Sequence, residues 1–230
     1  MEIRRKVIVF DMILPSILFI LLMATFQQTT LDHTLASHFY SPKQKWIYRN
    51  NTFLEVVLHK GGAKFVLGIF IILLGYLYYS FKFVHDKKPY KLCKFVIISS
   101  LLAIILTSLL KNVSTWACPW NSLIFGGQSS NLSLWNVFST NHPRAHCFPS
   151  GHASGGYAFL SLYYGFCFIY GKRNFYCLIP GILLGGIFGI TQQIRGAHFM
   201  SHDFATIIVS IFSAWVTYLI LDYYNNLHES

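Results

Sequence analysis

The chain has 230 residues, of which 54% are hydrophobic and only 11% are charged. Soluble domains carry about 25% charged residues, so the composition excludes an ordinary soluble globular protein. The formal net charge is +10, but no basic stretch is interleaved with aromatic residues as in a nucleic-acid binder. We therefore attribute the charge to membrane orientation and anionic lipid, and expect no nucleic-acid partner.

Six apolar runs are suited to membrane-spanning helices. In chain order they are Val7–Phe26, Phe65–Phe81, Phe95–Leu110, Ala153–Tyr170, Phe175–Ile194 and Phe204–Leu221. Between the first two, Phe53–His59 fits a short interfacial helix. The sequence thus predicts an all-α membrane protein, a bundle of six transmembrane helices that forms a single domain over residues 1–230.

Short basic segments set the expected orientation, because Lys and Arg in short loops mark the cytoplasmic side. These segments are Met1–Lys6, Lys82–Lys94 and Gly171–Asn174. Six helices with both termini in the cytoplasm satisfy all three. The polar stretch 27–64 then lies outside despite its basic residues, since long loops weigh less. We expect Lys87 and Lys172 to face the cytoplasm and Trp135 to face outward.

The stretch Pro149-Ser150-Gly151-His152 directly precedes the fourth apolar run. Ser150, Gly151 and His152 should therefore lie at a helix N-terminus, where backbone N–H groups lack partners and the helix dipole is positive. Such an end binds phosphate readily, and a histidine there can donate a proton near neutral pH. The alternative is an ordinary turn before a membrane helix.

The predicted topology gathers polar residues at the outer face. Lys111 and His152 lie in the segment joining the third and fourth helices, and Arg195 and His198 lie in the segment joining the fifth and sixth. Each alone could be an isolated interfacial residue. Together, they indicate a site.

Three ordered motifs in this region resemble those of the type 2 phosphatidic acid phosphatase (lipid phosphate phosphatase) superfamily. The family signature is K-x6-R-P, then P-S-G-H, then S-R-x5-H-x3-D. Residues 149–152 match the second motif in full. Lys111 and Pro119 match the first, but Cys118 replaces its arginine. The motifs cover about residues 111–203, and the six-helix plan extends the resemblance over nearly the whole chain.

The third motif departs further from the family pattern. Anchored on His198, it has Gln192 at the arginine position and His202 at the acid position. Anchoring on His202 instead would put Arg195 one residue out of register and Thr206 at the acid position. We therefore prefer His198.

The resemblance implies a phosphatase without metal or cofactor that acts on a membrane lipid phosphate or diphosphate through a phosphohistidine. His198 would attack phosphorus and His152 would protonate the leaving oxygen. Lys111, the Ser150 hydroxyl and the Gly151 N–H would hold the phosphate oxygens.

Further roles follow from the departures. His202, four residues after His198 and so on the same face of a helix, would orient the nucleophile, and Asp203 is the alternative. Arg195, one turn from Gln192, would supply the missing cation. We expect no zinc site, because His198 and His202 lack a third ligand at a recognisable spacing.

Two of the five cysteines flank the motifs. Cys118 directly precedes Pro119, and Cys147 precedes Pro149 by two residues. If both motifs wrap one phosphate, these cysteines come close, and the outer compartment of a bacterium is oxidising. We expect a Cys118–Cys147 disulfide, with two free thiols as the alternative.

Location limits the substrate, because a site at the outer leaflet suits an amphiphile that diffuses in the bilayer. Undecaprenyl diphosphate, phosphatidylglycerol phosphate, phosphatidic acid and lipid A phosphates all qualify. We expect a bacterial inner membrane protein with its site facing the periplasm or exterior. Alternatives are a weak or non-catalytic family member, a lipid phosphotransferase, and a transporter that uses intramembrane Asp11. The transporter is disfavoured, because the polar residues gather at one face rather than at the midplane.

Overall fold

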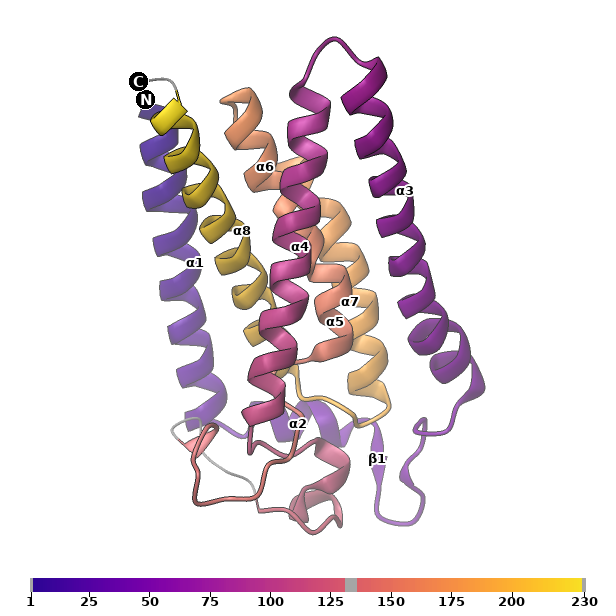
Figure 1. Cartoon of the computed structure of the whole chain (residues 1–230). Helices are drawn as coiled ribbons and strands as arrows, with labels where there is room; N and C mark the ends of the chain where they lie inside the picture. Colours follow the sequence, from indigo (N-terminus) through magenta and orange to yellow (C-terminus); the bar gives the residue numbers. More distant parts are fainter. Residues whose placement is uncertain (1, 131–135, 229–230) are drawn as a thin grey trace.

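The computed structural model describes residues 2–130 and 136–228, and Trp135 lies outside them. Their fold is almost entirely helical (Figure 1). The helices are α1 (Glu2–Gln28), α2 (Leu31–Ser37), η1 (Phe53–Gly61), α3 (Gly62–Phe83), α4 (Lys88–Val113), η2 (Pro119–Asn121), η3 (Leu123–Phe125), α5 (Gly151–Tyr157), η5 (Ala158–Leu160), α6 (Ser161–Tyr170), η6 (Phe175–Leu178), α7 (Ile179–Ile194) and α8 (Met200–His228). Two short antiparallel strands, β1 (Tyr40–Ser41) and β2 (Lys45–Trp46), form a hairpin that pairs Tyr40 with Trp46.

Four helical segments are long and apolar enough to cross a bilayer, and a fifth arises if one bent pair counts as a single span. The four are Phe53–Phe83, Lys88–Val113, Phe175–Ile194 and Met200–Tyr224, and the bent pair is Ile13–Phe26 with Leu31–Ser37, at 71°. A multi-pass membrane protein is the class that these helices indicate. The predicted fourth span is divided by η5 into helices of 7 and 10 residues, each too short to cross alone. Six spans therefore remain a prediction.

The bundle is held together by small residues and by aromatic packing. Gly156 on α5 and Gly185 on α7 let these helices approach so closely that a Cβ on either glycine would overlap the other helix. An aromatic cluster joins α4, α6 and α8; its members include Phe95, Tyr164 and Tyr218. On α3, by contrast, large apolar side chains such as Ile72 are exposed, as expected of a surface that faces lipid.

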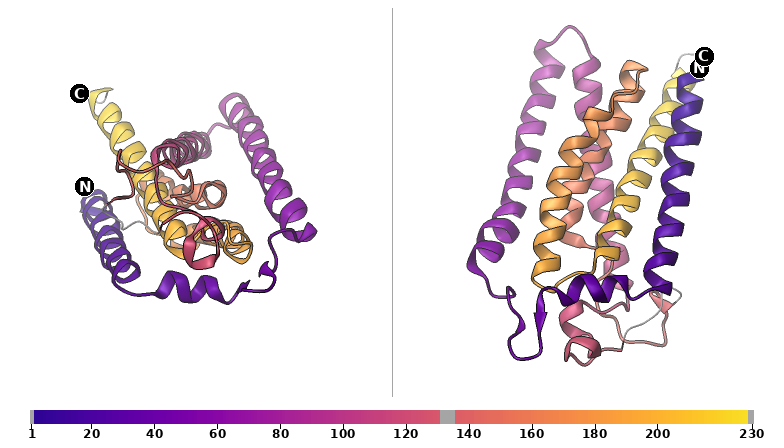
Figure 2. Two further views of the ribbon diagram at one scale, coloured as in Figure 1. Left: turned by 90° about the horizontal axis from the view of Figure 1, so that it is seen from below. Right: turned by 180° about the vertical axis from the view of Figure 1, so that it is seen from behind.

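The two ends of the bundle are built from different elements. The start of α1 and the end of α8 lie together at one end, and α2, the hairpin and the loops before α5 and α8 lie at the other (Figures 1 and 2). Toward the first end, Asp11 on α1 accepts a hydrogen bond from Tyr163 Oη at 2.8 Å and pairs with Arg173 at 3.1 Å. At the second end, Asp32 on α2 accepts the backbone N–H of Ser201 at 3.1 Å, which ties α2 to the N-terminus of α8. We call this second end the loop end.

Candidate active site

The segment before α5 fixes Ser150 without using its hydroxyl. Ser150 is the N-cap residue of α5 by position, but its side chain makes no capping hydrogen bond. Its N–H donates to the His202 carbonyl at 3.2 Å, and its own carbonyl accepts from Thr206 Oγ1 at 3.1 Å. The hydroxyl is buried beside Asp203 and has no well-aligned hydrogen-bond partner among the described residues. Backbone hydrogen bonds therefore hold Ser150 in place, and its hydroxyl has the Asp203 carboxyl beside it.

Lys111 reaches the start of α5 from the last turn of α4. A Cβ placed on Gly151 would lie 3.3 Å from Lys111 Nζ, so the ammonium group lies directly against this glycine. Its charge also acts on His152 and His198. The structure thus brings four predicted site residues close together at the loop end: Lys111, Gly151, His152 and His198.

His198 lies in the loop between α7 and α8 and is only 6% exposed. This loop turns at Gly196, whose φ of +76° favours glycine. Trp46 packs against Gly196, and the Trp120 N–H donates to the Gly196 carbonyl at 3.0 Å. Burial, with help from nearby His202 and Lys111, holds the pKa of His198 well below its ordinary value of 6.5. The imidazole is therefore neutral at neutral pH, as a nucleophile must be.

The neighbour of His198 is His202, in the first turn of α8. Their Nδ1 atoms lie 3.3 Å apart, so one nitrogen donates to the other. His202 is fully buried, and the rings of Trp116 and Phe148 meet it edge-on. Asp203, the alternative orienter, instead accepts a hydrogen bond from Gln193 Nε2. The structure does not bring Asp203 to His198.

His152 and Arg195 meet a segment that the sequence did not connect with the site. His152 Nε2 lies 3.3 Å from the carbonyl oxygen of Leu58, and its ring meets His59 edge-on with centroids 4.5 Å apart. Arg195 is 7% exposed and donates from NH1 to Gln192 Oε1 at 3.4 Å. Gln192 is buried too, and its Nε2 has no partner within the described ranges.

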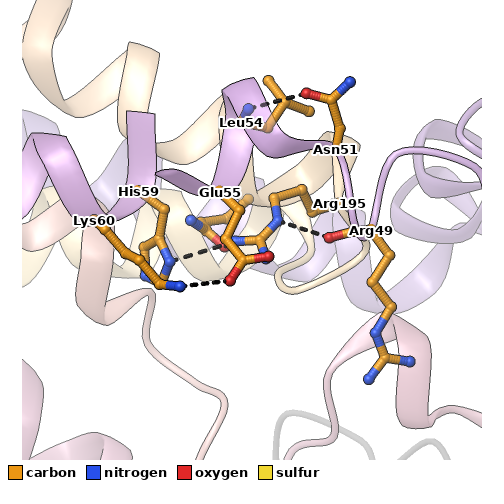
Figure 3. Close-up of polar contacts among 8 residues, drawn as sticks. Arg49, Asn51, Leu54, Glu55, His59, Lys60 and Arg195 are labelled. Carbon is orange, nitrogen blue, oxygen red and sulfur yellow. Dashed lines mark hydrogen bonds and ion pairs between the residues drawn. The ribbon is translucent and has the colours of Figure 1, made fainter. Parts of the chain in front are cut away.

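Sequence reasoning missed Glu55 and His59, which lie on η1 beside Arg195 (Figure 3). The segment Phe53–His59 was expected to be a separate interfacial helix, whereas η1 continues directly into α3. The available signal was a Glu and a His four residues apart on a short helix, which places them on one face. Nothing in the sequence shows that this face meets Arg195.

Cys118 and Cys147 form a disulfide with their Cα atoms 5.4 Å apart. This disulfide links the end of the first motif, at Pro119, to the segment just before the second motif, at Pro149. The sulfur of Cys147 lies 3.6 Å from His198 Nδ1, and the ligand atoms of Cys147, His198 and His202 lie within 4.8 Å of one another. A disulfide sulfur offers no thiolate to a metal, and the two imidazoles alone are too few for a tetrahedral zinc site.

Comparison with known proteins connects this geometry with a family. The family model of the PAP2 superfamily matches residues 91–226, more than half of the chain. Lys111, the segment 149–152 and His198 all lie inside the matched region. No curated protein and no solved structure matches the chain. On the strength of the family match, the chain belongs to the PAP2 superfamily.

Proposed function

We propose that this protein is a metal-independent phosphatase that removes phosphate from a membrane lipid phosphate or diphosphate through a phosphohistidine. Membership of the PAP2 superfamily implies lipid phosphate phosphatase-type activity in general. The observation that supports the finer proposal is the convergence of Lys111, His152 and His198 at the loop end, beside the start of α5.

In the first step, His198 attacks phosphorus while the bond from phosphorus to the lipid oxygen breaks, and protonated His152 gives its proton to that oxygen. Burial, with nearby His59, lowers the pKa of His152 to about 4, so His152 takes up this proton when the anionic phosphate binds beside it. In the second step, water attacks the phosphohistidine and gives a proton to His152, which the first step left neutral; the P–N bond breaks, and inorganic phosphate leaves. Charge grows on the three equatorial oxygens in each step, and fixed cations and N–H groups stabilise it. Lys111, the Gly151 N–H and the Ser150 hydroxyl are the groups we assign to these oxygens.

Two further residues complete this assignment. His202 positions His198 through the Nδ1 contact, which leaves His198 Nε2 free to attack. Arg195 supplies a cation at the position of Gln192, because its guanidinium already touches that side chain. Asp203 holds Gln193 rather than the nucleophile.

The substrate class follows from the position of the site at one end of apolar helices. A lipid that diffuses in the bilayer can bring its phosphate to this end while its chains remain in the hydrocarbon. Undecaprenyl diphosphate, phosphatidylglycerol phosphate, phosphatidic acid and lipid A phosphates meet this requirement. We propose an inner membrane location with the site on the periplasmic or outer side, based on the short basic loops at the opposite end.

A weak or non-catalytic role is the second candidate, because Cys118 and Gln192 replace two family arginines. A lipid phosphotransferase would use the same phosphohistidine with a lipid acceptor in place of water. A transporter finds less support, since Asp11 is engaged by Tyr163 and Arg173.

Phosphate release by the purified protein from a panel of these lipids, with EDTA present, tests the proposal. Wild type should release phosphate, and His198→Ala and His152→Ala should each lose at least about 10²-fold in rate. Equal inactivity of wild type and both variants would favour the non-catalytic role. Transfer of label to an added lipid would identify a phosphotransferase.

A further inference from the structure

Helix η1 has an unusual geometry and an unusual position. Its nine residues, Phe53–Gly61, are π-helical, whereas π-helix normally occurs as single-turn bulges, often at functional sites. The segment lies outside the region matched by the PAP2 family model. It nevertheless contacts the site, because the Leu58 carbonyl lies 3.3 Å from His152 Nε2.

His59 is oriented by the residue we assign as a phosphate cation. Arg195 NH1 lies 3.4 Å from His59 Nδ1. A guanidinium has only donors, so Nδ1 of His59 must be the acceptor and its proton must sit on Nε2. Among residues 2–130 and 136–228, the hydrogen bond of the His59 ring is the one to Arg195, so the Nε2–H remains available to a ligand. The ring of His59 also meets the ring of His152 edge-on, with centroids 4.5 Å apart, so His59 lies beside the proposed acid.

Glu55 fixes Arg195 from the same helix. Its Oε2 lies 3.6 Å from Arg195 NH2, and its Oε1 accepts from Lys60 at 2.8 Å. The Arg49 carbonyl accepts from Arg195 Nε at 3.1 Å on another side (Figure 3). The guanidinium is therefore held by a carboxylate, a carbonyl and an imidazole, and it has little freedom to leave the site.

We propose that His59 is a further phosphate-binding residue, which donates from Nε2 to the phosphoryl group of the lipid substrate, and that Glu55 is a positioning residue for Arg195. This inference rests on the proposed function. Its physical basis is that Cys118 and Gln192 stand where the family pattern has two arginines, and η1 brings a replacement donor and an anchor for the remaining arginine.

The first experiment compares His59→Ala, His59→Gln and Glu55→Gln in steady-state hydrolysis. His38→Ala, an exposed histidine at the same end of the molecule, is the matched control. We expect kcat/KM to fall about 10-fold or more in His59→Ala, since a hydrogen bond to a charged group is lost. His59→Gln keeps an N–H donor and should recover part of this loss. Glu55→Gln should lower kcat/KM, and His38→Ala should match wild type.

The second experiment measures binding of inorganic phosphate by calorimetry, which needs no turnover. His59→Ala and Glu55→Gln should weaken the affinity, with thermal unfolding used to confirm that each variant is folded; His59→Asn replaces His59→Ala if the latter is unfolded. The inference would be overturned if the wild type is active but the His59 variants have the same kcat/KM and the same phosphate affinity as His38→Ala. A wild type that hydrolyses no lipid but binds phosphate through His59 would overturn the proposed function and leave the site intact. A wild type that does neither would overturn both.

Discussion

The Cys118–Cys147 disulfide offers a quantitative test of how the site is held. The bond joins residues separated by 29 positions and closes the loop between the first two motifs. In the chain-entropy model, closing a loop of about 30 residues stabilises the folded state by roughly 3–4 kcal/mol. Cys118→Ser with Cys147→Ser should therefore lower the free energy of unfolding by about this amount.

Activity should fall together with stability, because Cys147 is buried against His198. The assay is reversible unfolding in detergent of wild type, the double variant and wild type with reductant, followed by phosphate release at a temperature where all are folded. Cys177→Ser is the control, since Cys177 is a free thiol. Alkylation of both Cys118 and Cys147 in unreduced protein would refute the reasoning. So would an unchanged free energy of unfolding in the double variant.

Three further predictions concern His198, the proposed nucleophile, and the orientation of the protein in the membrane. His202→Ala should reduce acid-labile phosphoenzyme formation more than Asp203→Asn, because His202 contacts His198; the reverse order would make Asp203 the orienting residue. Because the pKa of His198 is lowered in the folded state, the unfolded chain takes up a proton that the folded protein does not as the pH falls below 6.5. The free energy of unfolding should thus decrease below that pH, and His198→Gln should flatten the slope; a slope unchanged by the substitution would contradict the assigned pKa shift. In a variant that lacks the three free cysteines and keeps the Cys118–Cys147 disulfide, Arg144→Cys should react with a membrane-impermeant thiol reagent in intact cells. Lys172→Cys should react only after permeabilisation. The opposite pattern would move the site to the inner face of the membrane.

Hydropathy predicted where helices occur better than where they end. The run Phe95–Leu110 lies within α4, but α4 begins seven residues earlier, at Lys88. Lysines are good helix formers and remain solvated, so a membrane helix can continue past its apolar segment. The same effect joins η1 to α3, although His59, Lys60 and Lys64 interrupt the apolar pattern.

The local motifs were readable from sequence, and the long-range contacts were not. Ser150, Gly151 and His152 are adjacent in the chain, so their common position at a helix start follows from the motif itself. The contact of Arg195 with His59 joins residues 136 positions apart. The position of η1 at the foot of α3 brings them together, and no periodicity or spacing encodes that position.

Unpaired polar atoms at the loop end favour the phosphatase over a non-catalytic relative. Among the described residues, Gln192 Nε2 and His202 Nε2 are buried without a hydrogen-bond partner, and the buried Ser150 hydroxyl has only Asp203 beside it. Each such group costs about 1–3 kcal/mol if it stays unpaired. A protein that had lost its substrate would gain stability by replacing these groups with apolar ones. Their retention beside Lys111 and Arg195, two cations, is explained if an anion with several acceptor oxygens occupies this position during the working cycle.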